Sequence, residues 1–499
     1  MKIFFSLLII LSISMYAQDE DDLRQIIKEE DPEKIKEEKM KRLKEQMKRM
    51  EEEAEKGNRG AILEVGNNYF YGRGGLDQDF KKAVYWYQKG ADLNSRQCQF
   101  NLAGCYVKGN GVQPDPDKAL ELYMSAADFG LQAANINAAI ILDNMKKYEK
   151  ARHYFKQAAI INDARAQKKL AHYYEHGLGG EQNHSIAATF YLRTAKKGDA
   201  RSQLKVADYY NSGKGLPQNF KESMRWLVLA ADNESPEAQA KLGYCYINGL
   251  GVQKDPELGF KWYKRAADRN YSPAQLAVAN CYATGRAVPY NPEMAFQWYM
   301  KASKLKNRQA IFNVGACYAT GEGVEKDEKK ALEYYQKAVD LEFNAALYTM
   351  GVLYQTGEMV SKDERKAIVY FQKASKLDHV EATRELGLAF LLGKGVSANS
   401  DFAENMFRKA ASLGSSSAMI NLGMLYESKN YGKLDPKKAF EYYEKAAQSK
   451  DAEGSYRLAM AYMNGLGIEP NLKYSTLLLR EAANLGHKKA LQELNSLSK

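Results

Sequence analysis

The feature that most constrains the fold is a repeat of 36 residues that runs through most of the chain. A small residue, glycine or alanine, stands at Gly243 and returns at 36-residue intervals on either side of it. Gly66 and Ala103 belong to earlier copies, and Ala139 belongs to a copy that is four residues shorter. A fixed period of this length is typical of solenoids, in which each unit packs only against its neighbours. We therefore predict an array of about twelve repeats over residues 58–487 in place of several globular domains.

Each copy of the repeat predicts two helices joined by a glycine loop. Apolar residues three apart, such as Gly243 and Tyr246, predict a short helix with one buried face. Glycine at the Gly249 position of ten copies suits the left-handed residue that ends a helix. Asp or Asn stands at the Asp255 position in eleven copies, and proline follows it in four, which is the pattern of a helix N-cap. No stretch predicts a β-sheet, so the fold class is all-α.

The second predicted helix of each copy carries side chains that suggest how the repeats pack. A small residue, such as Gly259, recurs in every copy, so the two helices of a repeat can approach to about 8 Å. Four of the five cysteines share one apolar position of the first helix, and stacked helices about 8–10 Å apart are too distant for disulfides. We therefore expect five free thiols. We interpret all four tryptophans, which share one position, as packing contacts between repeats rather than as ligand-stacking residues: Trp86, Trp226, Trp262 and Trp298.

The stretch GYCYINGLGVQKDPELGFKWYKRAA, Gly243 to Ala267, combines these positions and resembles the Sel-one-like repeat (SLR), a relative of the tetratricopeptide repeat. The shortened copy, residues 137–159, lacks the glycine loop and is closer to a tetratricopeptide unit. The resemblance implies a right-handed α-solenoid superhelix of about twelve helix-turn-helix repeats, used as a protein-binding adaptor whose first helices line the concave face. It leaves two settings open, namely an adaptor in protein quality control or ER-associated degradation, and an adaptor of the bacterial envelope.

Three segments flank the array. Residues 1–17 have a basic start and an apolar run, the pattern of a cleaved secretory signal peptide, with an uncleaved anchor as the alternative. Residues 18–57 form a charged helical segment with Glu–Lys and Glu–Arg pairs four residues apart. Its apolar seam, about two heptads long, either caps the first repeat or forms a coiled-coil dimer through residues 32–56. Residues 488–499 are expected to form a C-terminal cap.

A signal peptide predicts that the chain works in an extracytoplasmic compartment. Three Asn-x-Ser sequons, at Asn183, Asn233 and Asn270, fit a eukaryotic secretory route, whereas the YAQ ending of the signal equally resembles a bacterial envelope signal. The choice between periplasm or secretion and the ER lumen stays open. No later segment predicts a membrane span. Lysine and arginine form no run with interleaved aromatics, so we expect no nucleic-acid partner.

One short motif has a spacing that is used in catalysis. His172, Glu175 and His176 match H-x-x-E-H, in which two imidazoles bind zinc and the glutamate acts as a base. Tyr174 in the same stretch is the aromatic residue of the repeat, which places both histidines at variable surface positions. We therefore expect a non-enzymatic protein with no catalytic residue, metal site or cofactor. The alternatives are a zinc hydrolase that uses this motif and, through the cysteine-rich bacterial branch of the resembled family, a bacterial envelope hydrolase or β-lactam-binding protein.

The position that follows Gly243 indicates where a partner binds. It varies in the early copies but is apolar in each of the last four, and residues three or four further on lie on the same helix face. If first helices line the concave face, these side chains form an apolar strip that binds another protein, and methionines adapt such a strip to its partner. The alternative is that neighbouring repeats half-bury this position. The predicted strip consists of Val352, Leu388, Leu391, Leu392, Met424, Met460 and Met463.

Overall fold

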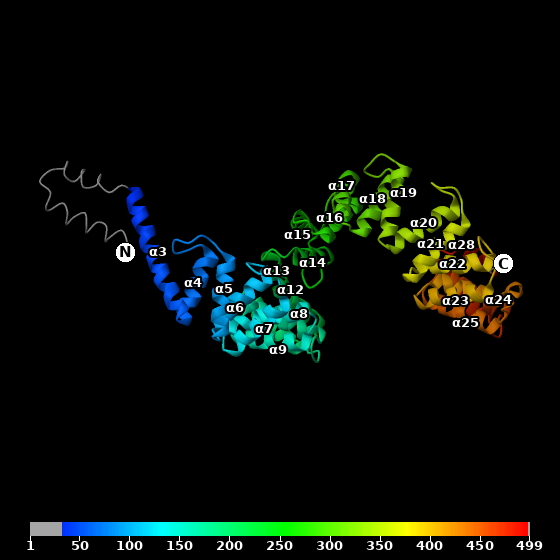
Figure 1. Ribbon diagram of the computed structural model, residues 1–499. Helices are drawn as coiled ribbons and strands as arrows, with labels where there is room; N and C mark the ends of the chain where they lie inside the picture. Colours follow the sequence, from blue (N-terminus) through cyan, green and yellow to red (C-terminus); the bar gives the residue numbers. More distant parts are fainter. Residues whose placement is uncertain (1–31, 498–499) are drawn as a thin grey trace. The chain divides into compact units, whose positions relative to one another are not determined.

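The computed structural model describes residues 32–497, and every regular element in that range is a helix (Figure 1). The predicted all-α class is therefore confirmed. Contacts divide the chain into two compact units, residues 1–234 and 235–499. The signal peptide predicted for residues 1–17 and the first part of the charged segment lie outside the described residues. Among the described helices, none combines the length and apolarity that crossing a bilayer requires.

In the first unit, the long helix α3 (Pro32–Glu55) precedes five stacked helix pairs. In the pair that forms the shortened copy, residues 145–147 replace the glycine loop. The pairs are α4 (Arg59–Tyr71) and α5 (Phe80–Asp92), α6 (Arg96–Lys108) and α7 (Pro116–Asp128), α8 (Gln132–Asn144) and α9 (Tyr148–Ile160), α10 (Ala164–His176) and α11 (His184–Ala195), and α12 (Ala200–Ser212) and α13 (Phe220–Asp232).

The second unit continues the same helix-turn-helix pattern, and its last helix, α28 (Lys488–Leu497), packs on the preceding one. A short 3-10 helix, η1 (Lys429–Tyr431), interrupts one of its loops. The pairs are α14 (Pro236–Asn248) and α15 (Pro256–Asp268), α16 (Ser272–Thr284) and α17 (Pro292–Lys304), α18 (Arg308–Thr320) and α19 (Glu328–Asp340), α20 (Asn344–Thr356) and α21 (Glu364–Lys376), α22 (Val380–Leu392) and α23 (Ser400–Ser412), α24 (Ser416–Glu427) and α25 (Pro436–Gln448), and α26 (Ala452–Asn464) and α27 (Leu472–Asn484).

The helix ends lie where the sequence predicts them. The side chain of Asp255 accepts a hydrogen bond from the backbone N–H of Leu258 at 2.9 Å, and all eleven Asp or Asn residues at this position form the same cap. Gly249 has a φ of 73° and donates its N–H to the carbonyl of Cys245, and all ten predicted glycines end their helices in this left-handed conformation. These caps satisfy backbone groups that would otherwise lack partners.

Small residues allow the two helices of a repeat to pack closely. A Cβ atom added to Gly243 would lie 2.8 Å from the carbonyl oxygen of Gly259 and 2.9 Å from the ring of Tyr263. A Cβ atom on Gly259 would lie 2.6 Å from Ile247. All three distances are shorter than van der Waals contact, so a larger side chain at either position would force its neighbours to shift.

The tryptophans and cysteines lie in or next to the core. Trp86 and Trp298 are buried, which agrees with their interpretation as packing residues, whereas Trp226 and Trp262 are only half-buried. All five cysteines are free thiols, as expected, and all but Cys245 are buried. Burial raises the pKa of three of them to about 11, which keeps these thiols protonated and poorly nucleophilic: Cys105, Cys281 and Cys317.

The C-terminal half of α3 packs on the first repeat. Met47 and Ala54 are buried, and Tyr69 of α4 donates a hydrogen bond to Glu51 at 2.6 Å. Met40 and Leu43, nearer the start of the helix, are each 38% exposed. The seam therefore caps the first repeat over part of its length, while dimerisation through residues 32–56 remains a prediction.

Candidate partner-binding site

A cleft of about 450 Å³ lies between first helices of the second unit, and it contains the middle of the predicted apolar strip. The floor of the cleft comes from α22 and α24, and further walls come from η1 and α26. Four of the seven predicted residues meet here, and five residues that the sequence did not single out join them. The lining consists of Leu388, Leu391, Leu392, Asn421, Met424, Glu427, Ser428, Tyr431 and Arg457.

The apolar residues of the cleft differ in exposure. Leu392 is 51% exposed and Met424 is 42% exposed, so both offer free apolar surface. Leu388 and Leu391 are half-buried and also pack against the core of the last repeats. These helices thus present apolar side chains of graded exposure to the cleft, and the helix period places Leu388 and Leu391 on one face.

The other three predicted residues do not line the cleft. Val352 is half-buried and packs on the core that includes α20 and α21, and Met463 is half-buried on the core of the last repeats. Met460 is also half-buried. None of the seven strip residues is fully buried, so their partner-binding role remains a proposal that the exposure pattern permits.

The wall of the cleft at Tyr431 exists because one loop departs from the repeat. Most copies have glycine at this loop position, where the loop presses on the preceding repeat. A Cβ atom on Gly323 or Gly467, which occupy this position in other copies, would lie 2.0 or 2.2 Å from a backbone carbonyl oxygen. Met359 occupies the same position with a φ of 63° in a loop that has no 3-10 helix, so the loss of this glycine alone does not change the loop. In the copy with Tyr431 the loop forms η1, and Gly432 adopts the left-handed conformation with a φ of 68°. The missing glycines at Lys429 and Tyr431 were the sequence signal for this wall.

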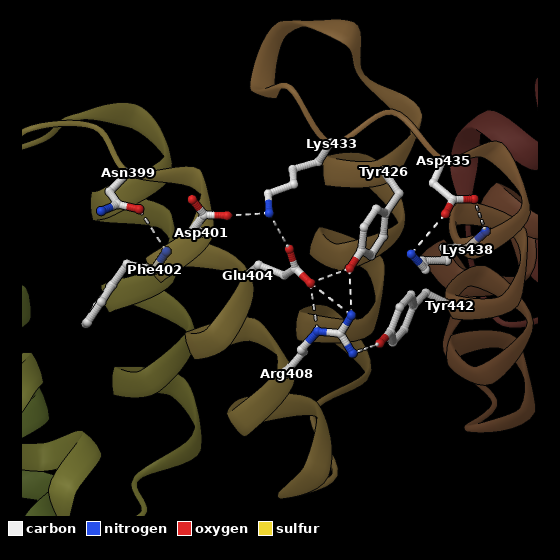
Figure 2. Close-up of polar contacts among 10 residues, drawn as sticks. All are labelled: Asn399, Asp401, Phe402, Glu404, Arg408, Tyr426, Lys433, Asp435, Lys438 and Tyr442. Carbon is white, nitrogen blue, oxygen red and sulfur yellow. Dashed lines mark hydrogen bonds and ion pairs between the residues drawn. The ribbon is translucent and has the colours of Figure 1, made fainter.

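A polar network fixes the remodelled loop to the preceding repeat (Figure 2). Lys433 forms ion pairs with Asp401 and, at 3.1 Å, with Glu404 of α23. Glu404 also accepts hydrogen bonds from the Tyr426 hydroxyl at 2.5 Å and from Arg408 at 2.9 Å. Burial alone would raise the pKa of Glu404, but the hydrogen bonds from Tyr426, Arg408 and Lys433 outweigh it and lower that pKa to about 2. The carboxylate is therefore charged at neutral pH and anchors the loop.

Polar groups stand at the edge of the cleft. Arg457 donates to Glu453 at 2.7 Å, and Glu427 accepts a hydrogen bond from the Tyr443 hydroxyl at 2.6 Å. The side-chain Nδ2 of Asn421 is buried and has no hydrogen-bond partner among the residues that the structure describes. Buried donors normally have partners, so an unpaired amide in a cleft is a group that a ligand oxygen can satisfy.

The H-x-x-E-H motif lies in the first unit, on α10, and its three side chains are close together. One possible ligand atom from each of His172, Glu175 and His176 lies within 4.8 Å of the others. Both histidines are exposed, as expected. Burial raises the pKa of Glu175, but hydrogen bonds from Lys205 and Tyr191 outweigh it and lower that pKa. A carboxylate held in two hydrogen bonds with a lowered pKa is a weak base, which disfavours the hydrolase alternative.

Comparison with known proteins places these repeats in a family. The sequence model of the Sel1 repeat matches twelve segments: residues 60–95, 96–130, 143–163, 164–199, 200–235, 236–271, 272–307, 308–343, 344–379, 380–415, 416–451 and 452–487. A crystal structure of c5321, a protective antigen of uropathogenic Escherichia coli with an SLR fold, aligns over 90% of both chains with 24% identity and a TM-score of 0.56. This likeness agrees with the α-solenoid fold.

Two curated relatives match shorter parts of the chain. A stretch of 130 residues is 32% identical to the ERAD-associated E3 ubiquitin-protein ligase component HRD3B of Arabidopsis thaliana, covering 26% of this chain and 15% of the relative. A stretch of 118 residues is 33% identical to the uncharacterized protein NMB1327 of Neisseria meningitidis, covering 23% of this chain and 25% of the relative. The chain thus spans a quarter or less of either relative. Because the twelve matched segments cover most of its length, the chain belongs to the Sel1 repeat family.

Proposed function

We propose that this protein is a non-enzymatic scaffold that binds another protein in the cleft of its C-terminal repeats. Sel1 repeats build protein-interaction scaffolds, which supports the general class. The observation that carries the proposal is that apolar residues at a variable helix position coincide with a departure from the repeat in the adjoining loop. The position after the small residue of the first helix is apolar at Leu388 and Met424, and the adjoining loop lacks the usual glycines at Lys429 and Tyr431. Local departures from an otherwise consistent pattern are expected at functional sites.

The cleft offers apolar surface on a firmly held frame. Full burial of a leucine or methionine side chain contributes about 1.5–3 kcal/mol, so covering the half-exposed Leu392 and Met424 offers on the order of 2 kcal/mol to a partner. Tyr431 and the flexible methionine add contact area that adapts to the partner's shape. Because the Lys433–Glu404 network already orders the loop, binding does not have to supply that ordering free energy.

The polar groups of the cleft indicate what kind of segment binds. A peptide that inserts apolar side chains between Leu392 and Met424 brings its backbone carbonyls close to the α24 surface. The unpaired Nδ2 of Asn421 then has an acceptor after a small side-chain rotation. Glu427 and Arg457 at the rim have opposite charges, so we propose an apolar anchor segment rather than a highly charged one.

The proposal that the protein is not an enzyme rests on the state of its candidate catalytic groups, a glutamate and several thiols. Glu175, the base of the H-x-x-E-H alternative, is already engaged by Lys205 and Tyr191. The buried thiols have raised pKa values, which makes them poor nucleophiles. A nitrocefin assay and a peptidase assay on the purified protein test both enzyme alternatives, and turnover in either would refute this part of the proposal.

We propose further that the scaffold works outside the cytosol, on the basis of the basic start and apolar run in residues 1–17. The Arabidopsis relative is named as a component of an ERAD-associated ligase. One form of the proposal is therefore that this protein is an adaptor for ER-associated degradation in the ER lumen. An envelope adaptor in a bacterium is the other. Mass measurement of the mature protein from its native organism tests export, since cleavage before Gln18 is expected.

Capture of the partner tests the binding proposal. Wild-type protein and the variant with both Leu392→Ser and Met424→Ser are used to co-purify partners from the native organism. The matched control is Leu472→Ser, because Leu472 is a 57% exposed leucine away from the cleft. A partner that is retained by wild type and control but lost by the cleft variant supports the proposal. Equal capture by all three proteins would refute it.

A further inference from the structure

We propose that His172, His176 and Glu175 of α10 form a binding site for a borderline divalent transition-metal ion, with Zn²⁺ as its test ion. One possible ligand atom from each side chain lies within 4.8 Å of the other two. The site belongs to the first unit, whereas the partner cleft belongs to the second. The two proposals therefore stand on different observations and can fail separately.

The spacing of the three side chains suits a small coordination sphere. Zinc bonds to nitrogen and oxygen of about 2.1 Å in tetrahedral geometry place neighbouring ligand atoms about 3.4 Å apart. His172 and His176 stand one helical turn apart, and their ring centroids are 4.2 Å apart. Both rings are exposed, so small rotations of their side chains are free to close the remaining gap. Two imidazoles in this arrangement can chelate one ion.

The surroundings orient the ligands. Nδ1 of His176 donates to the backbone carbonyl of His172 at 2.9 Å, because a carbonyl oxygen can only accept. This bond leaves Nε2 as the nitrogen with a free lone pair. Glu175 receives hydrogen bonds from Lys205 on one oxygen and from the buried Tyr191 on the other, both at 2.8 Å. Each carboxylate oxygen has a second lone pair available. Such supporting contacts are those that hold ligands in metalloproteins.

The donor set determines the class of ion. Imidazole nitrogens favour Zn²⁺, Cu²⁺ and Ni²⁺, whereas Ca²⁺ and Mg²⁺ favour sites made of oxygen ligands. Three protein donors leave the fourth tetrahedral position open to water or to another donor. His172 occupies the same position of its repeat as Met424 does in the cleft. The metal site therefore uses the same variable position of a first helix as the partner cleft does.

Calorimetric titration of the untagged, reduced full-length protein with ZnCl₂ tests the proposal. We expect one strong site per chain. Loss of a residue that only supports a metal ligand weakens metal binding by roughly 10–100-fold. His172→Ala and His176→Ala each remove a ligand and should weaken Zn²⁺ binding by more than that. Glu175→Gln should weaken it less than either histidine substitution. The matched control is His153→Ala, which removes an exposed histidine of α9 and should leave binding unchanged. Binding that survives in the variant lacking both His172 and His176, or a wild type that binds no ion, would overturn the proposal.

Two further measurements separate coordination from misfolding. The electron paramagnetic resonance spectrum of the Cu²⁺-loaded protein should show coupling to nitrogen in the wild type and lose it when both histidines are replaced. Melting temperatures in chelator should be equal for the wild type and the histidine variants, because both histidine side chains are exposed. A nitrogen signal that persists without the two histidines would place the ion elsewhere and refute the assignment.

Discussion

Replacing Glu404 by Gln tests how firmly the loop that walls the cleft is held. The network around this carboxylate lowers its pKa from an ordinary 4.5 to about 2. At 1.36 kcal/mol per pKa unit, this shift corresponds to about 3 kcal/mol of stabilisation at neutral pH. The side chain is only 15% exposed, so solvent screening removes little of it. Because glutamine keeps a hydrogen bond to Tyr426, we expect Glu404→Gln to lower the free energy of unfolding by about 2–3 kcal/mol.

The pH dependence of this loss has a defined direction. The folded-state pKa of Glu404 lies below its ordinary value, so the stabilisation is fully present above about pH 4.5. It is lost as the pH falls through about 2, where the wild-type carboxylate becomes protonated. Urea unfolding at pH 7, 4.5 and 3 should therefore show a difference between wild type and variant that is constant from pH 7 to 4.5 and smaller at pH 3.

The matched control for Glu404→Gln is Glu441→Gln, because Glu441 is exposed on α25. Its substitution should change the free energy of unfolding by no more than about 0.5 kcal/mol. Hydrogen exchange of residues 428–435 should also rise in the Glu404 variant alone, since Lys433 and Tyr426 lose their charged partner. Equal effects of the two substitutions, or a loss that does not change with pH, would refute the reasoning.

Four further outcomes follow from the structure. Gly423→Ala should destabilise the protein by about 1–3 kcal/mol in urea unfolding, because its Cβ atom would lie 2.3 Å from the ring of Tyr443. Leu388→Ser should lower the melting temperature more than Met424→Ser, because Leu388 packs on the core and Met424 is exposed. Mass spectrometry without reductant should find five free cysteines. The circular dichroism spectrum of the chain cut before Gln18 should be that of a helical protein, and a substantial sheet signal would contradict the fold.

The fold was predictable because its determinants recur in every repeat. Asp255 caps a helix through a bond to a residue three positions away, and Gly249 ends one through its own backbone conformation. Such local signals are visible in one sequence, and twelve copies reveal which positions are structural. The close approach at Gly243 and Gly259 likewise follows from the absence of side chains at both positions.

The candidate site was predictable only in part. The apolar position at Leu388 and Met424 was visible because the same position, variable in earlier copies, is apolar in each of the last four. The wall at Tyr431 was missed, although the loss of glycine at both Lys429 and Tyr431 marked it, because the course of the altered loop appears only in three dimensions. The bonds of Lys433 to Glu404 and of Lys205 to Glu175 join residues about thirty apart in the chain. No local rule specifies which of many charged side chains will pair over such a separation.

Site-specific photo-crosslinking tests the central claim most directly. A photoreactive residue replaces Met424 in one protein and Leu250, a 49% exposed loop leucine outside the cleft, in the other. Both are irradiated in cells of the native organism, and the crosslinked products are identified. The partner-binding account predicts a discrete partner protein crosslinked from position 424 and absent from position 250. Identical products from both positions, or none from position 424 while the protein remains folded, would contradict it.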